Sequence, residues 1–182
     1  MDAIHANRPR IQPRNYEELD PESATVWDEQ IERFGVMTTM KRTLALSPIA
    51  SDAVYKLYPM IDKVSEYVGR RATLIFLQAV SSETDCLICS TYFRKYLVDA
   101  GIDPDNFQLT GEEDALVEFG RAMARDNAWV PDEVYNRLDF LSDTAKVELV
   151  VLGGLMLVCN FFNNALHVQL DDFMEAYAEK AS

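Results

Sequence analysis

Residues 81–101 read SSETDCLICSTYFRKYLVDAG, and this stretch decides the fold more than any other. The polar run Ser81–Asp85 offers side-chain acceptors for the free backbone N–H groups at a helix start. Cys86 and Cys89 fall in the first turns of the predicted helix. We expect that helix to run to about Ala100, because the glycine that follows suits the left-handed position after a helix. The stretch therefore predicts one bounded helix that opens with a Cys-x-x-Cys pair.

Helical signals continue on both sides of this stretch. Apolar residues at a spacing near 3.6 predict an amphipathic helix over Pro21–Phe34. Further helices are expected from Pro48 to about Val68, over Ala72–Val80, from Thr110 to about Arg125, briefly at Pro131 and, as a long element, from about Thr144. Only 7 glycines and 7 prolines interrupt the chain, which favours long helices. We predict an all-α helical bundle.

Length and charge bound the organisation and the partners. The 182 residues, 48% of them hydrophobic, suffice for one domain with a full core. We expect that domain over residues 21–182, preceded by an arm over residues 1–20 that wraps a neighbouring subunit or stays mobile. The formal charge of −13 repels phosphate backbones and anionic lipids, so neither nucleic acid nor a membrane is an expected partner.

Two further features bear on location. Residues 1–20 hold no apolar segment typical of secretion signals, so a cytoplasmic protein is expected. The apolar stretch Leu149–Cys159 is shorter than the ~20 residues of a membrane span, so we interpret it as part of a core helix. Gly153 and Gly154 lie within it, and close helix packing explains them better than a phosphate loop, since no strand precedes them.

The cysteine pair permits three interpretations. At i and i+3 of a helix the two sulfurs share a face and can form a disulfide, which allows dithiol chemistry. The helix start favours a thiolate, whereas Glu83 and Asp85 oppose it, so the net direction of the thiol pKa stays open. Zinc would need two more ligands, and no second knuckle pattern supplies them, so no metal is expected. Buried packing of two cysteines is the third interpretation.

Other candidate residues carry less chemistry. Cys159 lies in the apolar stretch and is expected to be an inert buried thiol. Asn160 and Asn163 share one face of the same helix, and we expect them to cap or to form inter-helix hydrogen bonds. His167, near the end of that helix, is expected to complement the helix dipole or to be solvated. His5 lies in the arm and has no expected role.

In order and spacing, the motifs resemble the alkylhydroperoxidase AhpD-like, or carboxymuconolactone decarboxylase, superfamily from about Phe34 to Asp172. The residues that carry the resemblance are Arg42–Pro48, the Cys86-x-x-Cys89 helix ending at Gly101, Leu109–Ala124 and Phe140–Asp143 leading into Asn160–Asn163. The family fold is all-helical, and the resemblance implies an oligomer, a trimer or a hexamer, whose cysteine pair reduces a peroxide and is itself reduced by a thiol partner.

Carried over residue by residue, the resemblance makes Cys89 the peroxidatic cysteine and Cys86 the resolving one, with no cofactor. The family's histidine and glutamate positions hold Phe93 and Leu74, which implies weak peroxidase turnover. Glu83 is the candidate substitute base, and peroxide reactivity is expected to rise towards the ordinary thiol pKa near ~8.5. The alternative is a non-catalytic oligomeric helical protein whose cysteines pack or sense redox state.

Overall fold

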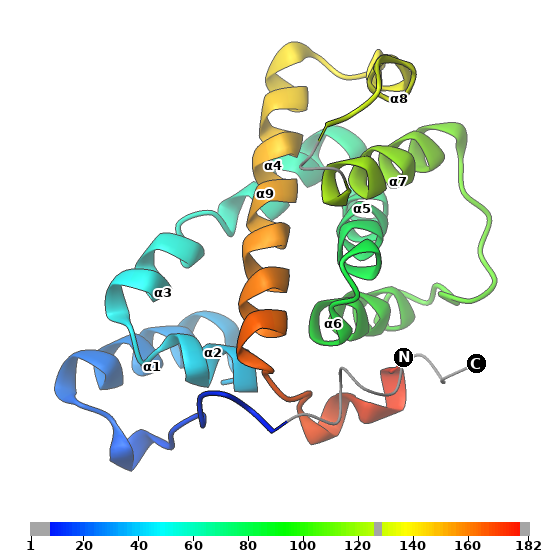
Figure 1. Cartoon of the computed structure of the whole chain (residues 1–182). Coiled ribbons are helices and arrows are strands. Elements are labelled where there is room, and N and C mark those ends of the chain that lie inside the picture. The colour runs from blue at the N-terminus through cyan, green and yellow to red at the C-terminus, as the bar shows by residue number, and fades with distance from the viewer. Residues whose placement is uncertain (1–7, 126–128, 179–182) are drawn as a thin grey trace.

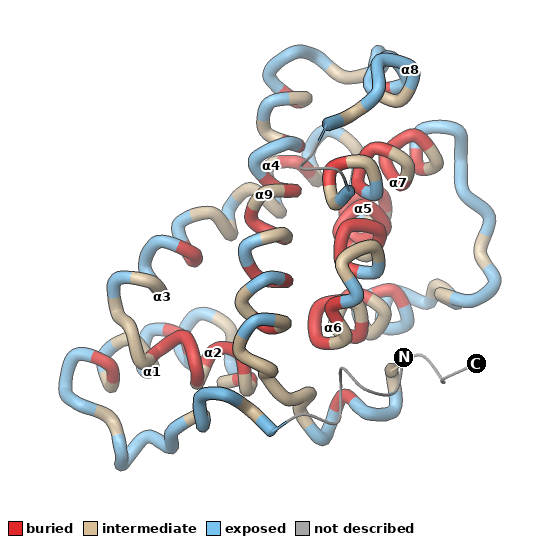
Figure 2. The backbone as a smooth tube through the Cα atoms, viewed as in Figure 1, coloured by how far each residue is buried: buried red, intermediate tan, exposed pale blue. Residues whose placement is uncertain are grey.

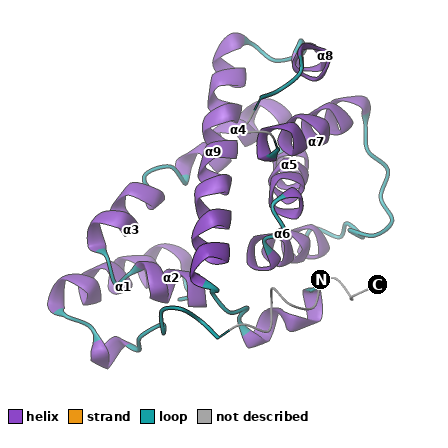
Figure 3. Cartoon of the chain, in the orientation of Figure 1, coloured by secondary structure: helices purple, strands orange, loops and turns teal. Residues whose placement is uncertain are grey.

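The structure is a computed structural model, and it describes residues 8–125 and 129–178. Within these ranges the regular secondary structure is entirely helical, as Figure 3 shows. The predicted all-α class is therefore confirmed. His5 and the first seven residues of the predicted arm lie outside the described residues.

Helix α5 (Arg70–Glu83) lies at the centre of the bundle. It packs against α4 (Pro59–Val68), α6 (Leu87–Asp99), α7 (Gly111–Ala124) and α9 (Asp143–Leu166), as Figure 1 shows. The tube in Figure 2 is buried along most of α5. Hydrophobic burial around this helix is the main stabilising contribution to the fold.

Of the two glycines of α9, Gly153 faces a neighbouring helix and Gly154 faces open space. A Cβ atom on Gly153 would lie 2.6 Å from the end of the Met123 side chain of α7, so any other residue here would have to displace that side chain. Gly154 has nothing within 4 Å of that position. Close packing is confirmed for Gly153 and does not apply to Gly154.

Several predicted helix limits are confirmed. Helix α1 (Pro21–Phe34) stops at Gly35, whose φ of 73° is left-handed. Gly101 follows α6 with a φ of 75°, and Thr110 opens α7 with a capping box. The remaining elements are η1 (Tyr16–Glu18), α2 (Thr39–Leu44), α3 (Pro48–Tyr55), α8 (Asp132–Tyr135), η3 (Asn136–Leu138) and η4 (Asp172–Tyr177).

Two predicted helices have different limits. The helix expected from Pro48 to Val68 is two helices, α3 and α4, because Pro59 cannot donate a backbone hydrogen bond and starts a new helix instead. The helix expected over Ala72–Val80 extends to Glu83, so the serines expected to cap the cysteine helix belong to α5.

The described part of the arm lies on its own chain. The backbone N–H of Arg10 donates to the carbonyl of Leu166 at 2.9 Å, and its guanidinium donates to Ala165 O at 2.8 Å. Arg42 of α2 donates to Arg14 O at 3.1 Å. These contacts hold the arm between the end of α9 and the start of the α1–α2 region.

Helix α9 is longer than its apolar stretch suggested. It has 24 residues and is long and apolar enough, by length and composition alone, to cross a membrane, so the shortness of Leu149–Cys159 does not exclude a span. Its packing against α4 and α5 agrees with the predicted core helix. Its inner face packs into the bundle with Leu149, Leu152 and Leu155 buried. Its outer face exposes Val147, Val150, Val151, Val158 and Phe161 at helical spacing. We call these five residues the α9 outer face.

We expect the α9 outer face to be buried between copies of the chain, since exposed apolar side chains gathered on one helix face are typical of an interface. Phe161, with 59% of its surface exposed, is the test position. Phe161→Glu should lower the molar mass measured by light scattering on a sizing column to that of a smaller species. Ile49→Glu, at an equally apolar exposed residue of α3, is the matched control. A monomeric parent protein at micromolar concentration would contradict the expectation.

Candidate functional site

The turn between α5 and α6 positions the two cysteines. Thr84 donates its hydroxyl to Val80 O and Ser81 O at 3.2 and 3.1 Å, which closes α5. Asp85 then takes a left-handed conformation with a φ of 50°. This conformation ends the helical path, so Glu83 is the last residue of α5 and Cys86 stands just before α6. The turn redirects the chain into α6.

Cys86 caps α6 and is not part of its first turn. Its Sγ accepts the backbone N–H of Cys89 at 3.5 Å, the bond that a serine or aspartate side chain makes at an ordinary N-cap. The expectation that the run Ser81–Asp85 caps this helix is therefore wrong, because the sulfur takes that place. The cap brings the Cys86 sulfur over the backbone of Cys89.

Asn163 of α9 connects both sulfurs. Its Nδ2 donates to Cys89 Sγ at 3.2 Å and lies 3.8 Å from Cys86 Sγ and 3.6 Å from Met40 Sδ. Asn163 is 2% exposed, and its Oδ1 has no hydrogen-bond partner among the described residues. One amide from a neighbouring helix therefore stabilises negative charge on either thiol.

Two further asparagines of α9 hold the turn itself. Asn160 Nδ2 donates to Thr84 Oγ1 at 2.8 Å, and Asn164 Nδ2 donates to Thr84 O at 2.9 Å. Ser81 donates its hydroxyl to Asn160 Oδ1 at 3.4 Å. The inter-helix hydrogen bonds predicted for Asn160 and Asn163 are confirmed, and they fix the cysteine turn to α9.

The pKa values of the two thiols are shifted in opposite directions. Both are free and buried, with exposures of 0% for Cys86 and 6% for Cys89. A hydrogen bond from the Cys89 thiol lowers the pKa of Cys86 below its ordinary value. The same bond, together with burial, raises the pKa of Cys89 well above it. The pair therefore carries its first negative charge on Cys86, with the remaining proton on Cys89.

Cys89 lies on the wall of a cavity of about 480 Å³. The cavity is enclosed by residues of α1, α2, α4, α5, α6 and α9 and reaches the surface beside the exposed Arg33, Asp62 and Arg70. Its apolar wall consists of Phe34, Val36, Met40, Ile61, Leu74, Leu77, Ile88, Phe93, Leu152, Leu155 and Met156. Cys86 is not among the residues that line it. A substrate in this cavity would therefore meet Cys89 and not Cys86.

Tyrosines make the remaining surface of the cavity partly polar. Tyr58, Tyr92 and Tyr96 line it. Tyr92 donates its hydroxyl to Asp171 Oδ2 at 3.0 Å, and Asp171 Oδ1 accepts the backbone N–H and the hydroxyl of Thr39 at 2.8 Å each. Burial raises the pKa of both Tyr58 and Tyr92, so their hydroxyls are protonated at neutral pH.

A lysine missed by the sequence analysis also lines the cavity. Lys41 is 9% exposed, and its Nζ donates to Val36 O at 3.3 Å and lies 3.8 Å from the centre of the Phe34 ring. Burial, with a smaller contribution from the charge of Arg33, lowers its pKa to about 8. Lys41 lies three and four residues before the apolar Leu44 and Ala45, and this spacing puts it on the buried side of α2. That spacing is the one signal in the sequence that indicates a buried lysine here.

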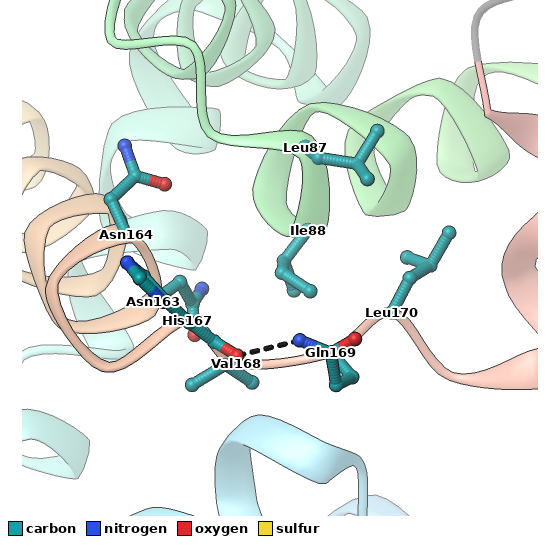
Figure 4. Close-up of a pocket in the computed structure, with 8 residues that line it drawn as sticks. All are labelled: Leu87, Ile88, Asn163, Asn164, His167, Val168, Gln169 and Leu170. Atoms are coloured by element: carbon teal, nitrogen blue, oxygen red, sulfur yellow. Dashed lines mark hydrogen bonds between the residues drawn. The ribbon is translucent and has the colours of Figure 1, made fainter. Parts of the chain in front are cut away.

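A second, small hollow is lined in part by Asn163. It has a volume of about 40 Å³, room for a water molecule, and Figure 4 shows the eight residues that line it. They are Leu87, Ile88, Asn163, Asn164, His167, Val168, Gln169 and Leu170. Gln169 donates to the backbone carbonyl of His167 at 2.8 Å, drawn as the dashed line.

The residues that the sequence analysis selected lie in different places. Phe93 and Leu74, at the family's proton-relay positions, both line the cavity, so its wall near Cys89 is apolar there. Cys159 also lines it, and burial raises its pKa to about 12, as expected of an inert thiol. His167 ends α9 in a left-handed conformation beside the small hollow.

Glu83 lies apart from the cavity-lining residues. Its carboxylate accepts two hydrogen bonds from Arg125, one of them 2.8 Å long from Nη2. Its predicted role as a proton acceptor stays a prediction, tested by Glu83→Gln. Within residues 8–125 and 129–178, no three histidine, cysteine, aspartate or glutamate side chains gather in a way that could hold a metal ion.

Comparison with known proteins supports the fold. No protein-family profile and no curated protein sequence matches the chain. Among solved structures, it is similar to a cysteine-to-alanine variant of the debrominase Bmp8 in complex with 2,3,4-tribromopyrrole, with a TM-score of 0.75 and 17% identity over 95% of this chain and 97% of that one. The apo form of Bmp8 matches with a TM-score of 0.73 and 18% identity over 92% and 95%.

A third similar structure is the alkylhydroperoxidase AhpD core of an uncharacterised peroxidase-related protein from Ralstonia eutropha JMP134. Its TM-score is 0.68, with 16% identity over 93% of this chain and 96% of that one. The chain therefore has the AhpD-like fold over nearly its whole length, and the resemblance seen in its motifs is confirmed at the level of the fold.

Proposed function

We propose that the protein is a thiol–disulfide oxidoreductase that reduces a small electrophile in the cavity of about 480 Å³. The observation that carries the proposal is the asymmetry of the pair. Cys89 lines the cavity, whereas Cys86 lies behind it, fully buried and hydrogen-bonded to Cys89. Cys89 is therefore the attacking sulfur and Cys86 the resolving one, the order that the family resemblance implies.

Cys86 also supplies proton transfer. In the singly ionised pair the charge lies on Cys86 and the proton on Cys89, because the hydrogen bond between them lowers the pKa of Cys86 and raises that of Cys89. As Cys89 attacks, its proton passes to Cys86, which activates the nucleophile without the family's histidine and glutamate. Asn163 donates to both sulfurs and so stabilises the charge wherever it lies. A buried thiolate thus takes the part of the missing base.

For a hydroperoxide, Cys89 takes the terminal oxygen and becomes a sulfenic acid, while the alkoxide leaving group takes the proton held by Cys86 and departs as an alcohol. The Cys86 thiolate then attacks the Cys89 sulfur, which forms the disulfide and releases hydroxide. An external dithiol supplies two electrons and two protons; the electrons and one proton restore the thiol and thiolate, and the second proton neutralises the released hydroxide. A thiol reductant partner is therefore part of the proposal.

An aryl bromide is a second candidate substrate, supported by the similarity to a debrominase and by the apolar wall around Cys89. Two thiols and the bromide give the arene, bromide ion, a proton and the disulfide, so the same two electrons are used. Cumene hydroperoxide and 2,3,4-tribromopyrrole, each with dithiothreitol, are the two assays. Turnover of either compound supports the proposal. If the protein turns over neither compound, the proposal is contradicted.

We expect mild oxidation to join Cys86 and Cys89 within one chain. Both sulfurs lie within reach of one amide nitrogen, and one caps the other's backbone. Intact mass should fall by two hydrogen atoms, and peptide mapping should place the bond in residues 72–94. Cys159→Ser is the matched control and should oxidise in the same way. A disulfide between two chains, or one that includes Cys159, would contradict the geometry.

A further inference from the structure

We propose that the cavity beside Cys89 takes an aromatic compound that carries one negative charge, and that Lys41, with Arg33, binds its anionic group. The inference rests on the proposed function, because it names the substrate class of that same site. Lys41 then determines specificity, while Cys89 carries the chemistry.

Two cations of the cavity have no carboxylate partner. Within the described part of the chain, neither Lys41 nor Arg33 forms an ion pair, although both lie against the ring of Phe34, at 3.8 and 5.0 Å from its centre. Asp62, the one carboxylate among the described residues that line the cavity, is paired with Arg70, at 3.6 Å. The cavity therefore has a positive end in a protein whose formal charge is −13.

A buried ammonium group without a counter-ion is costly, so its retention on a cavity wall points to a ligand that supplies the charge. Lys41 keeps unused donors, since one N–H of its ammonium group donates to Val36 O and the group has three. Burial and the nearby Arg33 lower its pKa to about 8, which still leaves it charged at neutral pH. An anion bound there would be stabilised by both cations at once.

The rest of the wall selects an aromatic body. Phe34 and Phe93 with Tyr58, Tyr92 and Tyr96 supply aromatic faces and edges, and about 480 Å³ holds a substituted ring. An alkyl peroxide offers no charge to Lys41 and no ring to these faces. An aromatic carboxylate or phenolate uses both, with its reactive substituent directed to Cys89.

Matched alkylating agents test the charge directly. Iodoacetate and iodoacetamide differ in charge but carry the same leaving group, so the ratio of their rates at Cys89 reports the anion preference. We expect Lys41→Met to lower that ratio about tenfold, the loss of one charge-assisted hydrogen bond. Lys41→Arg should retain most of the preference, and Lys63→Met, at a surface lysine of α4 paired with Glu66, is the matched control.

Protection of the unmodified protein provides a second measurement, which does not depend on the folding of a variant. Benzoate should slow the alkylation of Cys89 by iodoacetamide more than benzamide does at the same concentration. Equal protection, or none from either compound, would overturn the proposal, as would an unchanged rate ratio in Lys41→Met. If Cys89 reacts with neither alkylating agent in the native protein, the proposed function itself fails, so the two failures are distinguishable.

Discussion

Cys89→Ser should lower the rate of substrate reduction by about 10³-fold or more, because a serine hydroxyl at neutral pH is a far weaker nucleophile than a thiolate. The substitution leaves the cavity almost unchanged in shape, so the fall in rate reports the loss of the nucleophile and not a change in substrate binding. Stopped-flow kinetics with cumene hydroperoxide, under excess dithiothreitol, give the rate. Cys159→Ser is the control, since its thiol lines the same cavity but has a pKa of about 12 and stays protonated.

Cys86→Ser should fail differently. Without a resolving sulfur the reaction should stop after one equivalent, with the product still on Cys89, and this single event should be slower because the internal base is lost. Intact mass after mixing with one equivalent of substrate shows the adduct. If Cys86→Ser protein stayed unmodified while Cys89→Ser protein reacted once, the two roles would be reversed.

Asn163→Leu should raise the pKa of the reactive pair by about one pH unit. The Asn163 amide donates to both sulfurs, a hydrogen bond to a charged group contributes roughly 1.5–3 kcal/mol, and one unit corresponds to about 1.4 kcal/mol. The thiolate is present above the pKa, so reactivity is lost as pH falls through it. In the variant this loss should occur at higher pH, with a rate at pH 7 about tenfold lower.

The stability of Asn163→Leu shows whether a loss of rate comes from the thiol pKa or from unfolding. Asn163 Oδ1 is buried without a hydrogen-bond partner among the described residues, so leucine of similar size removes an unsatisfied group along with the bonds to sulfur. We therefore expect little change in the free energy of unfolding, measured by urea titration. Asn164, one position further along α9, contacts Thr84 O and no sulfur. The pH profile of the reaction rate should therefore be unchanged in Asn164→Ala. An unchanged profile in Asn163→Leu would show that the amide does not tune the thiols.

Local signals in the sequence predicted much of the fold. Proline, glycine and capping residues act on their immediate neighbours, so the limits of α1 and the cap of α7 could be predicted. Pro59 was the exception, because the apolar pattern continues across it into α4. The cap of α6 was also missed, since cysteine is not a usual N-cap residue and Asp85 takes a conformation that favours glycine.

The candidate site was only half predictable. Cys86 and Cys89 could be recognised by their spacing, and Asn163 could be recognised as a polar residue within an apolar helix. Lys41 lies 48 positions before Cys89 in the chain, and only the packing of α2 against the other helices brings both onto one cavity. Tertiary contacts of this kind leave no periodic pattern in the sequence. Glu83, selected by its nearness in sequence, is bonded to Arg125 from α7's end instead.

The most direct test of the account is which sulfur of the fully reduced, unmodified protein reacts first with limiting iodoacetamide. Peptide mapping with fragment ions distinguishes Cys86 from Cys89, and Cys159 lies on a separate peptide. We predict that the first label lands on Cys89, because it lines the cavity. A first label on Cys86, or labelling of all three cysteines only after unfolding, would contradict the account, and the latter result would favour cysteines that merely pack.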